Sequence, residues 1–144
     1  RAHVIMAKYL ALLALLMVAL ALAALGAWYY SRVLFDGPPL GDFLLLNLVG
    51  ALYLAVILAL TVLASTLARS TVVAGALSLG FWLALSLLGS LPGLRDWLPP
   101  ALVSHAAELG MGARPEVWPA GLVALGVIVA CLAGAWALLR RQEP

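Results

Sequence analysis

The chain has 144 residues, of which 66% are hydrophobic and 10% charged, with a formal net charge of +2 and a mean hydropathy of +1.15. Soluble domains carry about 25% charged and about 45–50% apolar residues, so this composition excludes a soluble fold and predicts an integral membrane protein. The small net charge argues against a nucleic-acid partner, and the lone cysteine, Cys131, excludes an intrachain disulfide.

The first third of the chain predicts one membrane span followed by a loop. Arg1 to Lys8 is a short, basic, amphipathic segment, and the stretch from Tyr9 to Tyr30 carries no charge. About 20 apolar residues cross a hydrocarbon layer, so this stretch predicts a transmembrane helix. Its last residues, Trp-Tyr-Tyr, are typical of the headgroup level. Ser31 to Asp42 contains Gly-Pro-Pro and a further glycine, which predicts a loop.

The middle of the chain contains two long apolar segments that are separated by a very short connection. They run from Phe43 to Ala68 and from Val72 to Leu91, and only Arg69, Ser70 and Thr71 separate them. Three polar residues do not carry a chain far from the bilayer, so the pair predicts a transmembrane hairpin.

The final third predicts a short helix and one more span. The connection from Leu91 to Glu116 is rich in proline and glycine, and within it residues 101–109 predict a short helix at the membrane interface. The last span runs from Val117 to Leu139. We therefore expect an all-α membrane protein forming a single transmembrane domain over residues 1–144. Its four spans lie at about 9–30, 43–68, 72–91 and 117–139, with a short extracytoplasmic interfacial helix.

Basic residues orient these spans. With both ends of the chain in the cytoplasm, five basic residues lie inside and three outside. Those inside are Arg1, Lys8, Arg69, Arg140 and Arg141, and those outside are Arg32, Arg95 and Arg114. The positive-inside rule favours this orientation and predicts a multi-pass protein of the cell membrane.

Small residues recur at helical spacing within two of the spans. Because apolar attraction does not drive helices together in lipid, close contacts depend on small side chains. One ladder consists of Ala51, Ala55 and Ala59, and another of Gly126, Ala130 and Gly134. We expect both ladders to lie in helix–helix contacts of a compact bundle.

The sequence holds no constellation of catalytic side chains. No span has a charge at mid-depth, and there is neither an H-E-x-x-H motif nor a nucleotide-binding glycine loop, so we expect no enzyme activity of its own and no cofactor. Asn47 predicts an interhelical hydrogen bond, with substrate contact as the alternative. His105 and Glu108 share a helical face, which we interpret as solvated rather than metal-binding, because a metal site needs more ligands.

Several stretches resemble the type-2 ABC transporter permeases. Residues 1–10 (RAHVIMAKYL) resemble the R-x-x-(apolar)-x-x-(small)-K-(aromatic or apolar)-L segment before the third span of that family. Residues 63–74 (LASTLARSTVVA) resemble its S-x-(apolar)-x-R-S-x-x-x-A cytoplasmic turn. Residues 98–102 (LPPAL) resemble its proline-marked outer segment, and residues 138–141 (LLRR) its basic ending.

The resemblance implies the membrane subunit of an exporter, which pairs with a second permease copy or paralogue and is driven by a separate ATP-binding-cassette ATPase. Family members typically have six spans, with a coupling element between the second and third, so we expect this chain to be a carboxy-terminal piece that lacks two upstream spans. The expected partner contacts are Arg1, His3, Lys8 and Arg69, with anchoring of the first span at anionic headgroups by Arg1 and Lys8 as the alternative. The alternative function is a non-transporting four-span scaffold or assembly factor.

Overall fold

The computed structural model describes the backbone of residues 2–35 and 39–141, and the side-chain surroundings of residues 6–35 and 39–138. Its elements are five helices: α1 (Ala2–Leu34), α2 (Leu40–Leu67), α3 (Thr71–Gly89), α4 (Ala101–Gly110) and α5 (Trp118–Arg141). Among the described residues, four helical segments are long and apolar enough to cross a membrane: Met6–Leu34, Leu40–Leu67, Thr71–Gly89 and Trp118–Leu138. The predicted all-α membrane fold with four spans is confirmed.

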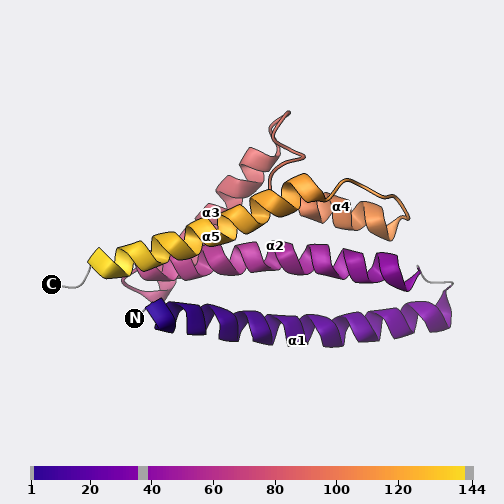
Figure 1. Ribbon diagram of the computed structural model, residues 1–144, viewed down its shortest axis with the longest axis horizontal. Coiled ribbons are helices and arrows are strands. Elements are labelled where there is room, and N and C mark those ends of the chain that lie inside the picture. The colour runs from indigo at the N-terminus through magenta and orange to yellow at the C-terminus, as the bar shows by residue number, and fades with distance from the viewer. Residues whose placement is uncertain (1, 36–38, 142–144) are drawn as a thin grey trace.

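Helix α2 lies at the centre of the bundle and contacts each of the other four helices. Figure 1 shows α1 and α5 running along α2 on different sides, while α3 leaves the bundle at an angle. The start of α1, the α2–α3 turn and the end of α5 lie together at one end of the bundle, which we call the turn end (Figure 1). The end of α1, the start of α2 and the end of α4 lie at the opposite end, the loop end.

The loop between the first two spans is shorter than the sequence predicted. We expected a loop from Ser31 to Asp42, but α1 continues to Leu34 and α2 begins at Leu40. No helix breaker precedes Gly37, and Pro39 stands just before the first helical residue of α2, a place that needs no backbone N–H. The Pro39 carbonyl accepts hydrogen bonds from the N–H groups of Asp42 and Phe43, each 3.1 Å long. Pro39 thus marks the start of a helix rather than the middle of a long loop.

The turn between α2 and α3 is as tight as the sequence predicted. Ala68 has an extended backbone (φ −86°, ψ 141°), which ends α2. Ser70 is also extended, and its side chain accepts a hydrogen bond from the Val73 N–H at 3.3 Å. A serine in this position satisfies one of the free N–H groups of the first helical turn. The turn therefore fixes where α3 starts, although α3 itself has no buried residue.

The short helix α4 packs along α2 instead of standing apart from the bundle. Leu102 and Leu109 of α4 are buried and belong to the core cluster around α2. The helix ends in two backbone bonds around Gly112, which has a φ of +82°. The Ala113 N–H reaches the Glu108 carbonyl at 3.0 Å and the Gly112 N–H reaches the Leu109 carbonyl at 3.1 Å. This Schellman arrangement reverses the chain and returns it toward α5.

Two clusters of buried residues hold the helices together. The first includes Val49 and Val56 of α2, Leu102 and Leu109 of α4, and Ala120 and Ala124 of α5. The second, nearer the turn end, joins α1, α2 and α5 through Tyr9, Ala59, Val62, Cys131 and Ala135.

The small residues of α2 and α5 lie differently from one another. Ala51, Ala55 and Ala59 are all buried, as their spacing led us to expect. On α5, Gly126 and Ala130 are exposed, and Gly134 is only partly buried. The face of α5 that packs within the chain carries instead Ala120, Ala124, Cys131 and Ala135. Gly126 follows Ala124 by two residues, which is about 200° around a helix of 3.6 residues per turn, so it points away from α2.

Enlarging a buried alanine should therefore separate the helices, whereas enlarging an exposed one should not. Ala59→Leu places a larger side chain at a position with no exposed surface, and overpacking of this kind costs about 1–3 kcal/mol. Thermal unfolding in a mild detergent should show a clear loss of stability for Ala59→Leu. Ala11→Leu is the matched control, because Ala11 is exposed on α1, and it should unfold like the wild type. Equal stability of all three proteins would contradict this arrangement of the helices.

Candidate functional site

A recess of about 340 Å³ lies between α2 and α3. Its lining consists of Ile57, Thr61, Gly75, Ser78, Leu79 and Trp82. The Thr61 and Ser78 hydroxyls donate hydrogen bonds of 2.9 and 2.8 Å to carbonyl groups of their own helices. Their oxygens can still accept a further hydrogen bond, because a hydroxyl has two lone pairs. The recess therefore presents hydroxyl oxygens and apolar carbon, without an ionised group, and suits a neutral or apolar guest.

A hydrogen bond between two aromatic side chains ties α3 to α2 beside this recess. The indole N–H of Trp82 donates to the Tyr53 hydroxyl, with 3.0 Å between nitrogen and oxygen. Since α3 has no buried residue, this bond is an unusually specific contact for a helix that otherwise packs loosely. Neither residue stands out in the sequence, because an aromatic residue within an apolar span is indistinguishable there from any other packing residue.

A second polar contact joins α1 to α2 near the turn end. Tyr9 is 5% exposed, and its hydroxyl donates to the backbone carbonyl of Ala55 across 3.3 Å. Ala59, Cys131 and Ala135 surround it in the same cluster, so three spans meet at this tyrosine. Burial of a phenol requires a partner for its O–H. Ala59, one turn further along α2, is small and so leaves the Ala55 carbonyl accessible.

The basic residues expected to contact a partner gather at the turn end as far as the structure describes them. Lys8 on α1 and Arg69 in the α2–α3 turn are exposed. The backbone of His3 belongs to α1, but its side chain is outside the described part of the chain, and so is Arg1 altogether. Figure 1 shows the start of α1 beside the α2–α3 turn, so Lys8 and Arg69 are carried by neighbouring elements. Their role as partner contacts stays a prediction.

Comparison with known protein families identifies the family of this chain. The model of the family described as ABC-2 family transporter protein matches residues 1–95, a range that contains α1, α2 and α3. The chain belongs to the ABC-2 transporter family. Comparisons with curated proteins and with solved structures give no match. Membership confirms the resemblance inferred from the turn and the basic segment, and it makes this chain a membrane permease of ABC-type transport.

In contrast to the tyrosine and tryptophan side chains, the amide of Asn47 and the hydroxyls of Thr61, Ser65 and Thr66 bond within their own helix. The Asn47 side-chain amide donates to the Phe43 carbonyl at 2.8 Å, so the expected interhelical bond of Asn47 was wrong. Thr61 bonds the carbonyl four residues earlier, whereas Ser65 and Thr66 bond carbonyls three residues earlier, at 2.8 and 2.7 Å. In lipid such back-bonding keeps a polar side chain satisfied without a neighbouring helix.

His105 and Glu108 lie on α4 and are both partly buried. The Nδ1 atom of His105 is enclosed and has no hydrogen-bond partner. Within the part of the chain that the structure describes, no three histidine, cysteine or carboxylate side chains come together in a way that could hold a metal ion. His105 and Glu108, three residues apart, share a face of α4. Among the described residues, no third histidine, cysteine or carboxylate joins them to form a metal site.

Removing the Trp82–Tyr53 hydrogen bond should loosen α3 from α2. We expect Trp82→Phe and Tyr53→Phe to destabilise the permease, and the double variant to be little worse than either single one. Interhelical hydrogen bonds in membranes contribute about 0.6 kcal/mol on average, which sets the expected coupling energy. A double-mutant cycle from SDS-induced unfolding measures it. Strictly additive effects would show that the two side chains do not act on each other.

Proposed function

We propose that this chain is the membrane-spanning subunit of an ABC-type exporter and forms part of the path of a substrate moved by a separate ATP-hydrolysing subunit. The observation that carries the proposal is the match to the ABC-2 family over the three spans that include the tight α2–α3 turn. In the described spans, charged side chains lie only near the helix ends, at Lys8, Arg32 and Asp42. A permease without ionisable groups at mid-depth has no proton relay of its own, so energy has to arrive through contact with a partner.

The turn end is the proposed contact surface for an ATP-binding-cassette ATPase. Exposed Lys8 and Arg69 lie there, and the chain continues from that end into Arg1 and His3 on one side and Arg140 and Arg141 on the other. This concentration of basic residues supports a cytoplasmic location under the positive-inside rule. Both ends of the chain and the α2–α3 turn would then face the cytoplasm, and the loop end the outside of the cell membrane.

A second permease copy or paralogue is the other proposed partner. Helix α3 has no buried residue, and its exposed apolar side chains include Val72, Leu79 and Leu83. On α5, Gly126 and Ala130 form an exposed small-residue face, which allows another helix to come close. We propose that these faces, which the chain does not use for its own packing, lie against the second permease.

The alternative function is a non-transporting scaffold with four spans. The hydroxyl-lined recess between α2 and α3 favours transport, because it offers a place for a guest molecule. The two functions are separable by whether the protein acts with an ATPase. Co-purification of the full-length protein with an ATP-binding-cassette subunit, and loss of transport when that subunit is deleted, support the permease. A protein that functions normally without any such subunit is a scaffold.

Charge reversal at the turn should uncouple the partner. We expect Arg69→Glu to lower the stimulation of ATP hydrolysis in the reconstituted complex, because an exposed arginine that meets an acidic surface contributes attraction and orientation. Membrane insertion and thermal stability should stay unchanged. Arg95→Glu is the matched control, since Arg95 is also exposed but lies between α3 and α4. A loss of stimulation of the same size in both variants would contradict a contact at the turn end.

Labelling of single cysteines tests the orientation. In a Cys131→Ala background, a cysteine at exposed Ser70 should react only with a reagent supplied from the cytoplasmic side. A cysteine at exposed Ala113 should react only from outside. Ala113 is preferable to Gly112, whose φ of +82° strains any other residue. Labelling of both positions from the same side would overturn the four-span topology.

A further inference from the structure

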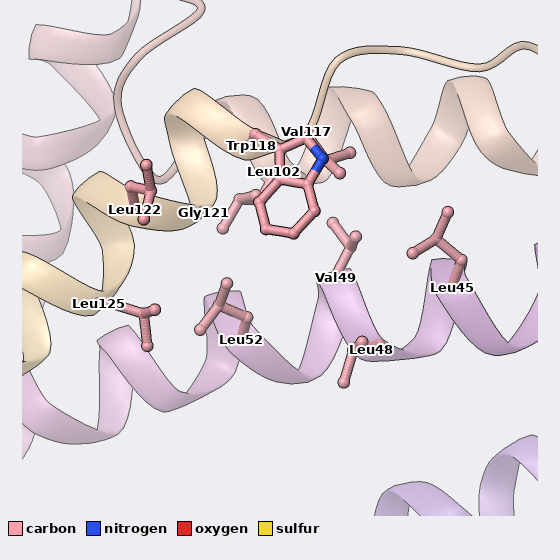
Figure 2. Close-up of a pocket in the computed structure, with 10 residues that line it drawn as sticks. All are labelled: Leu45, Leu48, Val49, Leu52, Leu102, Val117, Trp118, Gly121, Leu122 and Leu125. Atoms are coloured by element: carbon pink, nitrogen blue, oxygen red, sulfur yellow. The ribbon is translucent and has the colours of Figure 1, made fainter.

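A groove of about 230 Å³ lies between α2, α4 and the first turns of α5. Figure 2 shows Val49 and Leu52 of α2 on one side of it and Trp118 and Leu122 of α5 on the other. Its lining consists of leucine, valine, tryptophan and glycine residues, so hydrocarbon forms nearly all of its surface. The polar recess between α2 and α3 is a different site, with different lining residues.

The groove exists because α5 carries a glycine where it faces α2. A Cβ atom added at Gly121 would lie 3.8 Å from the Leu52 Cδ2 atom, which is an ordinary contact. A larger side chain would extend into the empty volume. The groove is also open to the outside of the bundle, because Trp118 and Leu122 at its edge are 75% and 65% exposed. An occupant can enter from the side without any movement of the helices.

The level of the groove along the membrane-spanning helices determines which part of the bilayer surrounds it. Leu45 and Leu52 lie five and twelve residues into α2, or about 8 and 18 Å from its start at 1.5 Å per residue, and both line the groove. These positions are inside a candidate membrane span, and Trp118 begins another. The medium at this level is the acyl-chain region of one leaflet, so hydrocarbon rather than water meets the mouth of the groove.

The size and chemistry of the groove select one kind of occupant. A helix with its side chains is about 10–12 Å wide, so a second copy of the chain could place single side chains in this volume but not a helix. An apolar cavity of about 150 Å³ stays dry and binds benzene, so a larger apolar groove favours a hydrocarbon chain over water. Because lipid tails are as apolar as leucine, the gain comes from van der Waals contacts that an empty groove lacks.

A basic residue is available for the other end of such a molecule. Arg114 is exposed and stands four residues before Trp118, on the segment that returns from the loop end to α5. Four extended residues span at most about 14 Å, which is within the length of a lipid molecule. Guanidinium groups bind phosphate through paired hydrogen bonds. We propose that the groove between α2, α4 and α5 binds one acyl chain of a phospholipid whose phosphate is held by Arg114.

The bound chain fills the space between α5 and α2 beneath α4, where the protein lacks side-chain volume. This site depends on the membrane location of the permease and not on its ATPase partner. It is consequently testable in the isolated chain, whether or not the proposed exporter function holds.

Photo-crosslinking with a phospholipid that carries a diazirine at mid-acyl chain tests the site in lipid nanodiscs. Mass spectrometry of wild-type protein should find labels concentrated on Trp118, Leu122 and Leu125, several-fold above those on Val129, which is as exposed as Leu122 (66% against 65%) but lies outside the groove. This comparison needs no variant. Labels spread evenly over these residues would mean ordinary annular lipid and would overturn the proposal. Crosslinks between two protein chains at the groove, without lipid, would overturn it as well.

Two variants then divide the site into its parts. Gly121→Leu should fill the groove and abolish the enrichment, while Gly126→Leu, on the exposed face with no atom within 4 Å of its Cβ position, should leave it intact. Loss of the enrichment in both variants would contradict a site at Gly121. Arg114→Ala should reduce the retention of phospholipid in native mass spectrometry several-fold. Unchanged retention would overturn the assignment of the phosphate to Arg114.

Discussion

In a bilayer the apolar surface of a helix is as well solvated by lipid as by another helix, so association depends on how closely two backbones can approach. Helix α2 meets this constraint with Ala51, Ala55 and Ala59, which are all buried. Every other helix of the chain contacts α2. The alanine face is therefore the feature on which the bundle depends, because larger residues there would move α1 and α5 apart at the same time. The leucines around it fill space but do not set the distance.

Close approach also decides where a polar side chain can reach across the bundle. Tyr9 donates to the Ala55 carbonyl of α2, and Ala59, one turn further along, is small and so leaves this carbonyl accessible, because helical side chains lie over the preceding turn. Where no neighbour is near, the polar groups of the spans turn back on their own helices, as Asn47 and Ser65 do. Both solutions satisfy hydrogen-bonding groups that lipid cannot satisfy. The interhelical bonds of Tyr9 and Trp82 therefore form only where a second helix supplies the acceptor. The hydrogen bonds within one helix form wherever that helix forms.

The sequence determines the spans well and their faces poorly, for a physical reason. Length and hydropathy alone identify the four spans, because a chain has to satisfy the same membrane thickness everywhere. Two small-residue faces are present on α5, one through Ala124 and one through Gly126, and periodicity does not distinguish them, because both permit close packing. Which of the two faces packs inside the chain depends on where α2 lies relative to α5, and only the folded bundle determines this position. The loop at residues 31–42 was predicted too long for a related reason. Pro39 there precedes the first turn of a helix whose buried face is supported by its neighbours.

The recess of the permease and its apolar groove lie on different sides of α2, and α3 connects the turn end with the region of α4. Its first residues are fixed by the Ser70 cap. Its last, Gly89, lies so close to Pro100 that a Cβ atom there would come within 3.1 Å of the proline ring. Between these two points α3 has no buried residue, and the Trp82–Tyr53 bond holds it to α2. Helix α3 is thus fixed at both ends but loosely packed along its length, and it links the turn at Arg69 to the start of α4. Helix α4 in turn packs through Leu102 and Leu109 on the loop-end half of α2, so the two ends of the bundle are connected through elements that all depend on α2.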